Sequence, residues 1–297
     1  MEPKRNKLFA DIGLLYCAAI WGSTFILVKG ALDSVNPVTM VAIRFLMAAV
    51  LMLPWVVKRK NFKAHIKEGC ILSVILALLY ISQTVGLVYT TASNSGFITG
   101  LFIIVIPLFL FVFRRERPTR LQSFSAALAL AGMWLLTGGI KGFNLGDALT
   151  LIAAGTYAAH LIFIDKYVKA DADPVMLAFH QFWMTSLIAF LMSALLGYPL
   201  GVGSLNAWGV LVFLAVFPTL TAFYIQMLAQ KGSTPFKAGL IFTLEPVFAA
   251  AFAWTLGGEI FVPMKAAGGS LIVLGMIMGE LSKAYSGRTA AKEILPV

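Results

Sequence analysis

Long runs of apolar residues, separated by short polar segments, follow one another along nearly the whole chain. Each run has about 20 residues, which is enough at about 1.5 Å per residue to cross a hydrocarbon core of about 30 Å. Because the connections between the runs are short, we expect an all-α integral membrane protein without a separate soluble domain. The pattern predicts ten transmembrane helices: Leu8–Val28, Pro37–Val57, Gly69–Tyr89, Asn94–Phe113, Leu121–Gly138, Gly146–Tyr167, Pro174–Leu196, Ala207–Leu228, Pro235–Leu256 and Met264–Lys283.

The composition is that of a membrane protein rather than of a soluble domain. Of the 297 residues, 60% are hydrophobic and 12% are charged, and the mean hydropathy is +0.88. We therefore expect a multi-pass protein of the cell membrane, which in a Gram-negative bacterium is the inner membrane. The two cysteines, Cys17 and Cys70, indicate neither a disulfide framework nor a metal site. We expect no metal and no cofactor.

The basic residues are distributed unevenly between the two sides of the predicted membrane. The formal net charge is +10. If the N-terminus is placed in the cytoplasm, most lysines and arginines fall on the cytoplasmic side, whereas Lys29, Lys141 and Lys265 fall outside. This positive-inside distribution predicts that both termini are cytoplasmic. It explains the basicity without nucleic acid, so the expected partners are the lipid bilayer and a small-molecule substrate.

The two halves of the chain resemble each other in sequence. The stretch PVTMVAIRFLMA in the first half parallels PVMLAFHQFWMT in the second, so that Arg44 corresponds to Gln181. We divide the chain into two repeats, residues 1–142 and 143–297, each with five predicted helices. Because five is an odd number, the second repeat is inverted relative to the first. Inverted repeats are typical of transporters and predict alternating access.

Three stretches carry a resemblance to a known family: WGSTF at 21–25, TTASNSGFITGL at 90–101 and AGLIFTLEPVFAAAFAWTLGGE at 238–259. Through them the whole chain resembles the EamA-type branch of the drug/metabolite transporter superfamily. The resemblance implies a ten-helix exporter of small metabolites, often amino acids. It also implies a central cavity lined by the first, third, fourth, sixth, eighth and ninth helices.

Aromatic and neutral polar residues recur at helical spacing in four of these predicted helices. They combine ring faces with hydroxyl, amide and imidazole groups, the chemistry of a pocket for an amphipathic solute. For any single residue, helix packing explains the pattern equally well, but the repetition favours a cavity for neutral or aromatic amino acids. With the intramembrane carboxylate of Glu245, the candidate substrate-binding residues are Trp21, Thr24, Tyr80, Gln83, Thr84, Tyr157, His160, Thr221, Tyr224 and Glu245.

Two prolines and two charged residues stand out within the predicted helices. Pro107 and Pro246 occupy corresponding positions in the two repeats, and a proline in a helix interior frees a carbonyl four residues back, so we expect gating hinges at both. Glu245 has no counterpart, because Ile106 takes its place. It is either a functional carboxylate or a strongly hydrogen-bonded one. For Arg44 we favour a structural role, in which it snorkels to the interface or pairs within the fold.

Two other classes of function compete with an alternating-access transporter. One is an uncoupled channel-like facilitator, which saturable flux and counterflow would distinguish. The other is an intramembrane enzyme, which would need a nucleophile with a base or clustered carboxylates. The histidines His65, His160 and His180 lie in different segments, without a recognisable serine motif, so we expect no catalytic residues. Monomer and homodimer both remain open, as do proton coupling, exchange and uncoupled transport.

Overall fold

Helices make up the regular structure of the described chain, apart from an isolated β-bridge between Val35 and Val202. The structure is a computed structural model that describes residues 2–59, 61–138, 143–255 and 260–293. The first half forms α1 (Glu2–Gly22), α2 (Thr24–Ala31), α3 (Pro37–Val56), α4 (Ile66–Tyr89), α5 (Ala92–Gly100), α6 (Phe102–Arg114) and α7 (Arg120–Thr137). The second half forms α8 (Leu145–Lys169), α9 (Pro174–Leu195), α10 (Leu205–Leu214), the π-helix η1 (Ala215–Thr221), α11 (Ala222–Lys231), α12 (Pro235–Phe242), α13 (Glu245–Thr255) and α14 (Pro263–Glu293).

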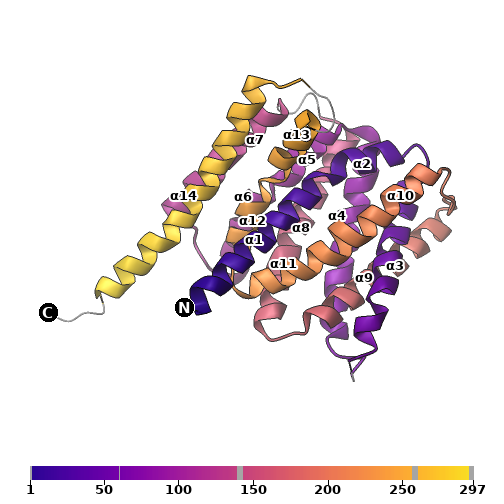
Figure 1. Ribbon diagram of the computed structural model, residues 1–297, viewed down its shortest axis with the longest axis horizontal. Helices are drawn as coiled ribbons and strands as arrows, with labels where there is room; N and C mark the ends of the chain where they lie inside the picture. Colours follow the sequence, from indigo (N-terminus) through magenta and orange to yellow (C-terminus); the bar gives the residue numbers. More distant parts are fainter. Residues whose placement is uncertain (1, 60, 139–142, 256–259, 294–297) are drawn as a thin grey trace.

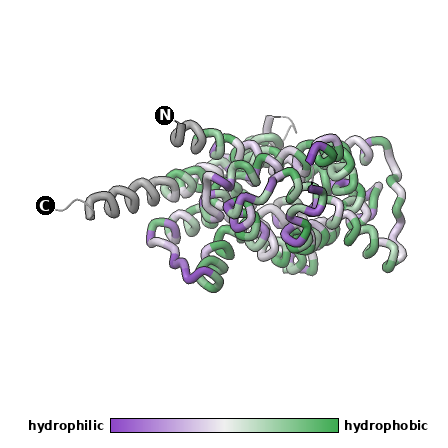
Figure 2. The backbone as a smooth tube through the Cα atoms, turned by 90° about the horizontal axis from the view of Figure 1, so that it is seen from below, coloured by the Kyte–Doolittle hydropathy of each residue, from purple (hydrophilic) through white to green (hydrophobic). Residues whose placement is uncertain are grey.

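Eight stretches of the described chain are long and apolar enough to cross a membrane: Leu8–Ala31, Pro37–Val56, Ile66–Tyr89, Asn94–Arg114, Leu145–Lys169, Pro174–Leu195, Leu205–Lys231 and Pro235–Phe252. Hydrophobic colour accordingly covers most of the backbone in Figure 2. These eight correspond to eight of the ten predicted helices, and the chain is an all-helical multi-pass membrane protein. The fifth predicted helix forms α7, which begins with polar residues, and the tenth falls in α14, whose apolar part Pro263–Gly279 is shorter.

The same capping device starts the second predicted helix of each half. The Asn36 side chain accepts a hydrogen bond from the Val38 amide at 2.9 Å, and Asp173 accepts one from the Val175 amide at 2.9 Å. In both helices the next residue is a proline, which lacks the amide proton that a first helical residue leaves unpaired. Asp173 also pairs with Arg59 at 3.0 Å, so it serves as a cap and an ion-pair partner.

Several predicted helices are interrupted. The first breaks at Ser23, the fourth at Leu101 and the ninth between Phe242 and Glu245. Pro107 lies inside α6 as expected, but Pro246 is the second residue of α13, where a proline costs no backbone hydrogen bond. The ninth predicted helix is therefore divided rather than kinked, because α12 ends at Phe242, the residue four positions before Pro246. The gating role of both prolines stays a prediction.

The two halves pack against each other through corresponding helices. Contacts are most extensive between α7 and α14, and α3 packs along α9, while α4 contacts both α8 and α9. Figure 1 shows α14 beside α7 at one edge of the bundle, with the start of α1 and the end of α14 towards the same end. Lys141, the predicted repeat boundary at 142/143 and the Leu256 end of the ninth predicted helix lie outside the described residues.

Small residues allow α7 and α14 to approach closely. A Cβ atom on Gly268 would lie 2.6 Å from the Gly132 carbonyl oxygen, and one on Gly275 would lie 2.9 Å from the Ser125 carbonyl oxygen. Any larger residue at these positions would force the helices apart, as at small-residue crossings of membrane helices. The two halves are thus held together along this edge by backbone proximity.

Candidate functional site

Three of the predicted binding residues meet in the middle of the bundle. The Tyr157 hydroxyl on α8 donates a hydrogen bond of 3.1 Å to Glu245 Oε1 at the start of α13. Trp21, near the end of α1, meets the Tyr157 ring edge-on with centroids 6.1 Å apart. All three side chains are buried. The first, sixth and ninth predicted helices therefore contribute to one centre, as the resemblance implies.

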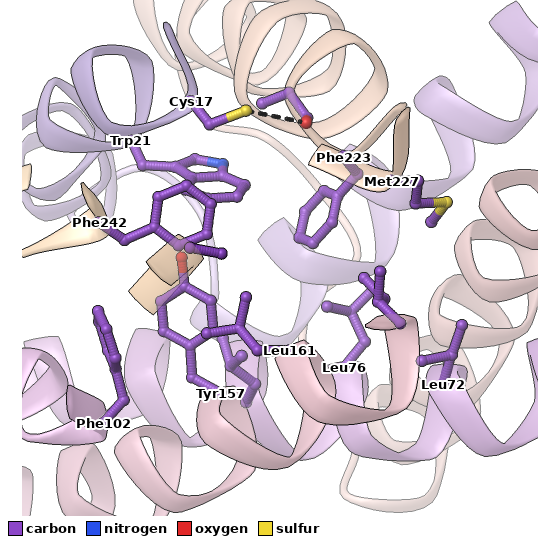
Figure 3. Close-up of a cluster of buried hydrophobic side chains, with 14 of the residues drawn as sticks. Cys17, Trp21, Leu72, Leu76, Phe102, Tyr157, Leu161, Phe223, Met227 and Phe242 are labelled. Atoms are coloured by element: carbon purple, nitrogen blue, oxygen red, sulfur yellow. Dashed lines mark hydrogen bonds between the residues drawn. The ribbon is translucent and has the colours of Figure 1, made fainter. Parts of the chain in front are cut away.

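Two phenylalanines that the sequence did not single out complete this aromatic group. Phe242 lies 4.9 Å from Trp21 between ring centroids, and Phe102 lies 4.7 Å from Tyr157. In Figure 3, Trp21, Tyr157 and Phe242 gather on one side of the cluster, and Phe223 faces them from the other. The Glu245 carboxyl group is thus bound by a phenol within an aromatic enclosure.

Gly22 in the WGSTF stretch explains how α1 comes so close to α13. A Cβ atom at this position would lie 2.4 Å from the Glu245 carbonyl oxygen and 3.1 Å from Phe248 Cβ. Real side chains do not tolerate such distances, so residue 22 must be a glycine for Trp21 to reach its neighbours. Close packing of α1 against α13 therefore explains the glycine at the second position of the WGSTF stretch.

Phe223 on α11 lies at the junction of several helices. Its ring centroid is 5.4 Å from Trp21, 6.1 Å from Tyr80 and 5.6 Å from His160. His160 is fully buried, and its Nε2 donates to Gln181 Oε1 at 3.0 Å. Tyr80 and His160 are therefore joined to the Trp21 group through a residue that was not predicted to line the cavity.

Arg44 lies inside the protein and does not snorkel to the interface. Its side chain is 4% exposed, and Nε donates to Thr219 Oγ1 at 2.5 Å. Its guanidinium carbon lies 4.5 Å from the centre of the Tyr80 ring, and Nη2 lies 3.4 Å from the Tyr80 hydroxyl. Burial follows because α3 packs between α9 and η1 rather than at the periphery. The centre thus contains a buried cation as well as a buried carboxyl group.

The π-helix η1 supplies backbone and hydroxyl partners to this centre. Pro218 has no amide proton, so the Leu214 carbonyl loses its usual helical donor. That carbonyl accepts instead from Thr219 Oγ1 at 2.7 Å. The Pro218 carbonyl in turn accepts from Trp21 Nε1 at 2.8 Å. The irregular turn η1 of the second half is therefore hydrogen-bonded to Trp21 and Arg44 of the first half.

The remaining predicted residues lie around the centre with different surroundings. Gln83 Nε2 donates to Thr99 Oγ1 at 3.0 Å, and Thr84 is buried on the same helix. Thr24 Oγ1 donates to the carbonyl of Trp21. Half-buried side chains at the edge of the centre are Thr221, whose hydroxyl is 2.6 Å from that of Tyr16, and Tyr224.

Two open pockets lie at opposite ends of the bundle, away from the buried centre. The larger, about 760 Å³, is lined by the ends of α2, α4 and α7 and includes Lys29, whose ammonium group donates to the carbonyls of Leu87 and Thr90. The smaller, about 210 Å³, includes Pro107 and an ion-pair group in which Asp165 binds Arg114 and Lys169. The residues that line these two pockets do not include Trp21, Tyr157 or Glu245.

The described side chains include no group of three or more histidine, cysteine, aspartate or glutamate residues placed to hold a metal ion together.

Comparison with known proteins agrees with this architecture. The EamA-like transporter family matches the chain twice, over residues 8–138 and 144–279. A solved crystal structure of a protein with 18% sequence identity superposes with a TM-score of 0.78 over 92% of this chain and 96% of its own. At that identity the likeness shows the shared fold.

Related sequences carry transporter names. A protein of Archaeoglobus fulgidus named an uncharacterized transporter is 35% identical over 283 residues, covering 93% of this chain and 87% of its own. The inner membrane transporter YedA of Escherichia coli K12 is 26% identical over 93% of this chain and 91% of its own. A Salmonella typhimurium protein named a probable amino-acid metabolite efflux pump is 26% identical over 88% of this chain and 91% of its own. The chain belongs to the EamA-like transporter family and is a membrane transporter, not an enzyme.

Proposed function

We propose that the protein exports small amphipathic metabolites, most of all neutral or aromatic amino acids, by alternating access through its centre. The observation that carries this proposal is the buried group of Trp21, Tyr157 and Glu245 beside Phe223 and Arg44. Ring faces suit an apolar side chain, and charged and hydrogen-bonding groups suit the polar end of the same molecule.

The arrangement of the two halves supports alternating access. Corresponding helices meet in pairs, α3 with α9 and α7 with α14, which suits two inverted five-helix repeats. The distribution of basic residues supports the proposal that both termini are cytoplasmic. The proposed repeats are residues 1–142 and 143–297, with α7 and α14 completing the ten helices. Pockets at both ends and a buried centre between them fit a path that opens to one side at a time.

The proposed hinges are the helix breaks near the centre. In the first half the break at Leu101 precedes Pro107 in α6, and in the second half the break after Phe242 precedes Pro246 in α13. Interrupted helices lack continuous backbone hydrogen bonding at the break, so bending there costs little. Both breaks flank the residues proposed to bind substrate, so bending would open or close the centre.

The proposed binding residues are the ten predicted from the sequence, with Phe223 and Arg44 added. The name of the Salmonella relative, a probable amino-acid metabolite efflux pump, supports the substrate class. The proposal holds for a monomer and for a homodimer alike.

Transport by the purified protein in proteoliposomes tests the proposal. Vesicles loaded with a mixture of neutral and aromatic amino acids should release at least one of them faster than protein-free vesicles, with saturation and counterflow. Release of none would refute the substrate class. Release that does not saturate and shows no counterflow would favour the channel-like facilitator, which the dense packing of rings around Phe223 argues against.

A further inference from the structure

Arg44 is a buried cation without a carboxylate partner among the described residues. The ion pairs of the described chain involve other basic side chains, namely Arg59, Arg114, Lys169 and Lys237. The contacts of Arg44 are instead the neutral hydroxyls of Thr219 and Tyr80 and the faces of the Tyr80 and Phe45 rings. A full positive charge in the membrane interior is costly, and neutral partners compensate it only in part.

The guanidinium group also has donors to spare. Nε is used by Thr219, and Nη2 makes only a long contact of 3.4 Å with Tyr80. Within the described part of the chain, Nη1 makes no hydrogen bond. The outer edge formed by Nη1 and Nη2 is the edge with which arginine binds a carboxylate through two parallel hydrogen bonds.

Two further polar atoms near Phe223 lack hydrogen-bond partners among the described residues. They are His160 Nδ1 and Gln181 Nε2, both on fully buried side chains. His160 contacts the Phe223 ring, which also contacts Tyr80. Gln181 occupies the position in the second repeat that corresponds to Arg44 in the first. Buried polar groups are normally paired, so the unpaired atoms of His160 and Gln181, together with the unused donors of Arg44, point to a polar ligand in the centre.

We propose that Arg44 binds the carboxylate group of the transported solute, with Nη1 and Nη2 as the two donors. This inference rests on the proposed function and narrows its substrates to molecules with a free carboxylate beside an apolar or aromatic group. In the conformation described, Thr219 and Tyr80 take up some of the hydrogen-bond donors of the Arg44 guanidinium group. Because Thr219 belongs to η1 in the opposite half, separation of the halves would release that contact and free the cation for the ligand.

A carboxylate fits this site better than a phosphate. Arg44 is a single cation, and every other lysine or arginine of the eight candidate spans lies within a few residues of a span end. A doubly charged phosphate would leave one charge uncompensated among aromatic rings, which is unfavourable. A monocarboxylate matches the site in charge and in its planar geometry.

Ligand binding to the purified wild-type protein in detergent tests the inference. The measurement is the thermal unfolding temperature as a function of the concentration of L-phenylalanine, 3-phenylpropionate, L-phenylalaninamide or phenyl phosphate. The two carboxylates should stabilise the protein at concentrations roughly tenfold to a hundredfold lower than the amide, the range expected for loss of hydrogen bonds to a charged group. Equal effects of acid and amide, no effect of either carboxylate, or a stronger effect of phenyl phosphate would each overturn the inference.

Variants show whether Arg44 is the group responsible. Arg44→Gln should bring the acid and the amide to nearly equal potency, and Arg44→Lys should retain an intermediate preference because it keeps the charge without the paired donors. Arg59→Gln makes the same change at an arginine with a 48% exposed side chain and should leave the preference unchanged. If Arg44→Gln folds and keeps the full preference, the inference is wrong. If Arg44→Gln does not fold, the comparison of acid with amide on the wild-type protein still tests the inference.

Failure of the inference and failure of the proposed function give different results. If amino acids and their amides are transported with equal potency, the carboxylate site is refuted but the proposed export function is not. Selective binding of carboxylates without transport of any amino acid in proteoliposomes would refute the amino-acid substrate and leave Arg44 as a carboxylate site.

Discussion

Trp21 Nε1 donates a hydrogen bond of 2.8 Å to the carbonyl oxygen of Pro218, and this bond joins α1 of the first half to η1 of the second. The acceptor is a backbone atom, made reachable where η1 departs from the α-helical pattern. The same turn holds Thr219, which accepts from Arg44. One irregular turn therefore connects two first-half helices to the centre.

Trp21→Phe should destabilise the protein because it removes this hydrogen bond and leaves the Pro218 carbonyl without its indole donor. We expect a loss of about 1–2 kcal/mol in unfolding free energy, measured as a lower thermal unfolding temperature in detergent. Trp208→Phe, at an indole that is 42% exposed on α10, is the matched control and should have little effect. Equal effects of the two changes would contradict the role given to the Trp21–Pro218 bond.

Phe223→Ala should be among the most damaging single truncations in the centre. The ring is 2% exposed and contacts Trp21, Tyr80 and His160, so its removal leaves a cavity and should cost about 3–5 kcal/mol. Phe217→Ala removes the same ring at a position that is 44% exposed and should cost much less. Thermal unfolding of both variants measures the difference. A larger loss for Phe217→Ala would mean that Phe217, and not Phe223, is the ring packed in the centre.

Tyr157→Phe should lower both stability and transport. The change leaves the ring in place but removes the donor to Glu245 Oε1, so a buried carboxyl oxygen loses its partner, at a cost of about 1–3 kcal/mol. The exchange rate in proteoliposomes should fall, whereas Tyr198→Phe in the loop before α10 should leave it unchanged. A Tyr157→Phe protein with wild-type transport would remove the Tyr157–Glu245 pair from the proposed binding centre.

Asp165→Asn should loosen the end of the bundle that contains Pro107. The Asp165 side chain is 2% exposed and binds Arg114 of α6 at 3.2 Å, so its neutralisation weakens a link between the two halves. Because the Arg114 side chain is 30% exposed, we expect a modest loss of about 1–2 kcal/mol.

Cysteine labelling in detergent measures this opening. In a background without Cys17 and Cys70, a Leu110→Cys side chain in the smaller pocket should react faster with a maleimide when Asp165→Asn is present. A Val88→Cys side chain in the larger pocket at the opposite end is the control and should not react faster. Unchanged labelling at position 110 would show that the Asp165 group does not hold this end closed.

The sequence was sufficient to predict the membrane fold and the meeting of Trp21, Tyr157 and Glu245. Apolar runs of bilayer length and the match between the halves depend on local composition, which a single sequence contains. In the eighth predicted helix the periodicity selected Tyr224, which is half-buried, and did not select Phe223, which is 2% exposed and contacts Trp21, Tyr80 and His160. The pattern combined ring faces with hydrogen-bonding groups, so a purely apolar ring gave no signal. The sequence did contain a signal of the irregular turn η1, namely Pro218.

The partners of charged groups were harder to predict than the groups themselves. Arg44 and Glu245 were visible as rare ionisable residues in apolar segments, but the contact of Arg44 with Thr219 joins residues 175 positions apart. No local pattern specifies such a contact, because it depends on how α3 packs against η1. For the same reason the sequence left open whether Arg44 snorkels to the interface or pairs within the fold, and the packing of α3 against α9 and η1 decides for the second.

The position of Trp21 gives the protein a built-in optical probe. Its indole is 5% exposed and packed among the rings of the centre, whereas Trp55, Trp134 and Trp208 are about half exposed on the outer surface. If water enters the centre whenever the two halves separate, this indole moves from a dry to a wet environment while those three keep theirs. Its fluorescence emission would then shift to longer wavelength with each opening. A variant in which the half-buried Trp183 and Trp254 are replaced by phenylalanine would therefore report the conformational cycle without an added label.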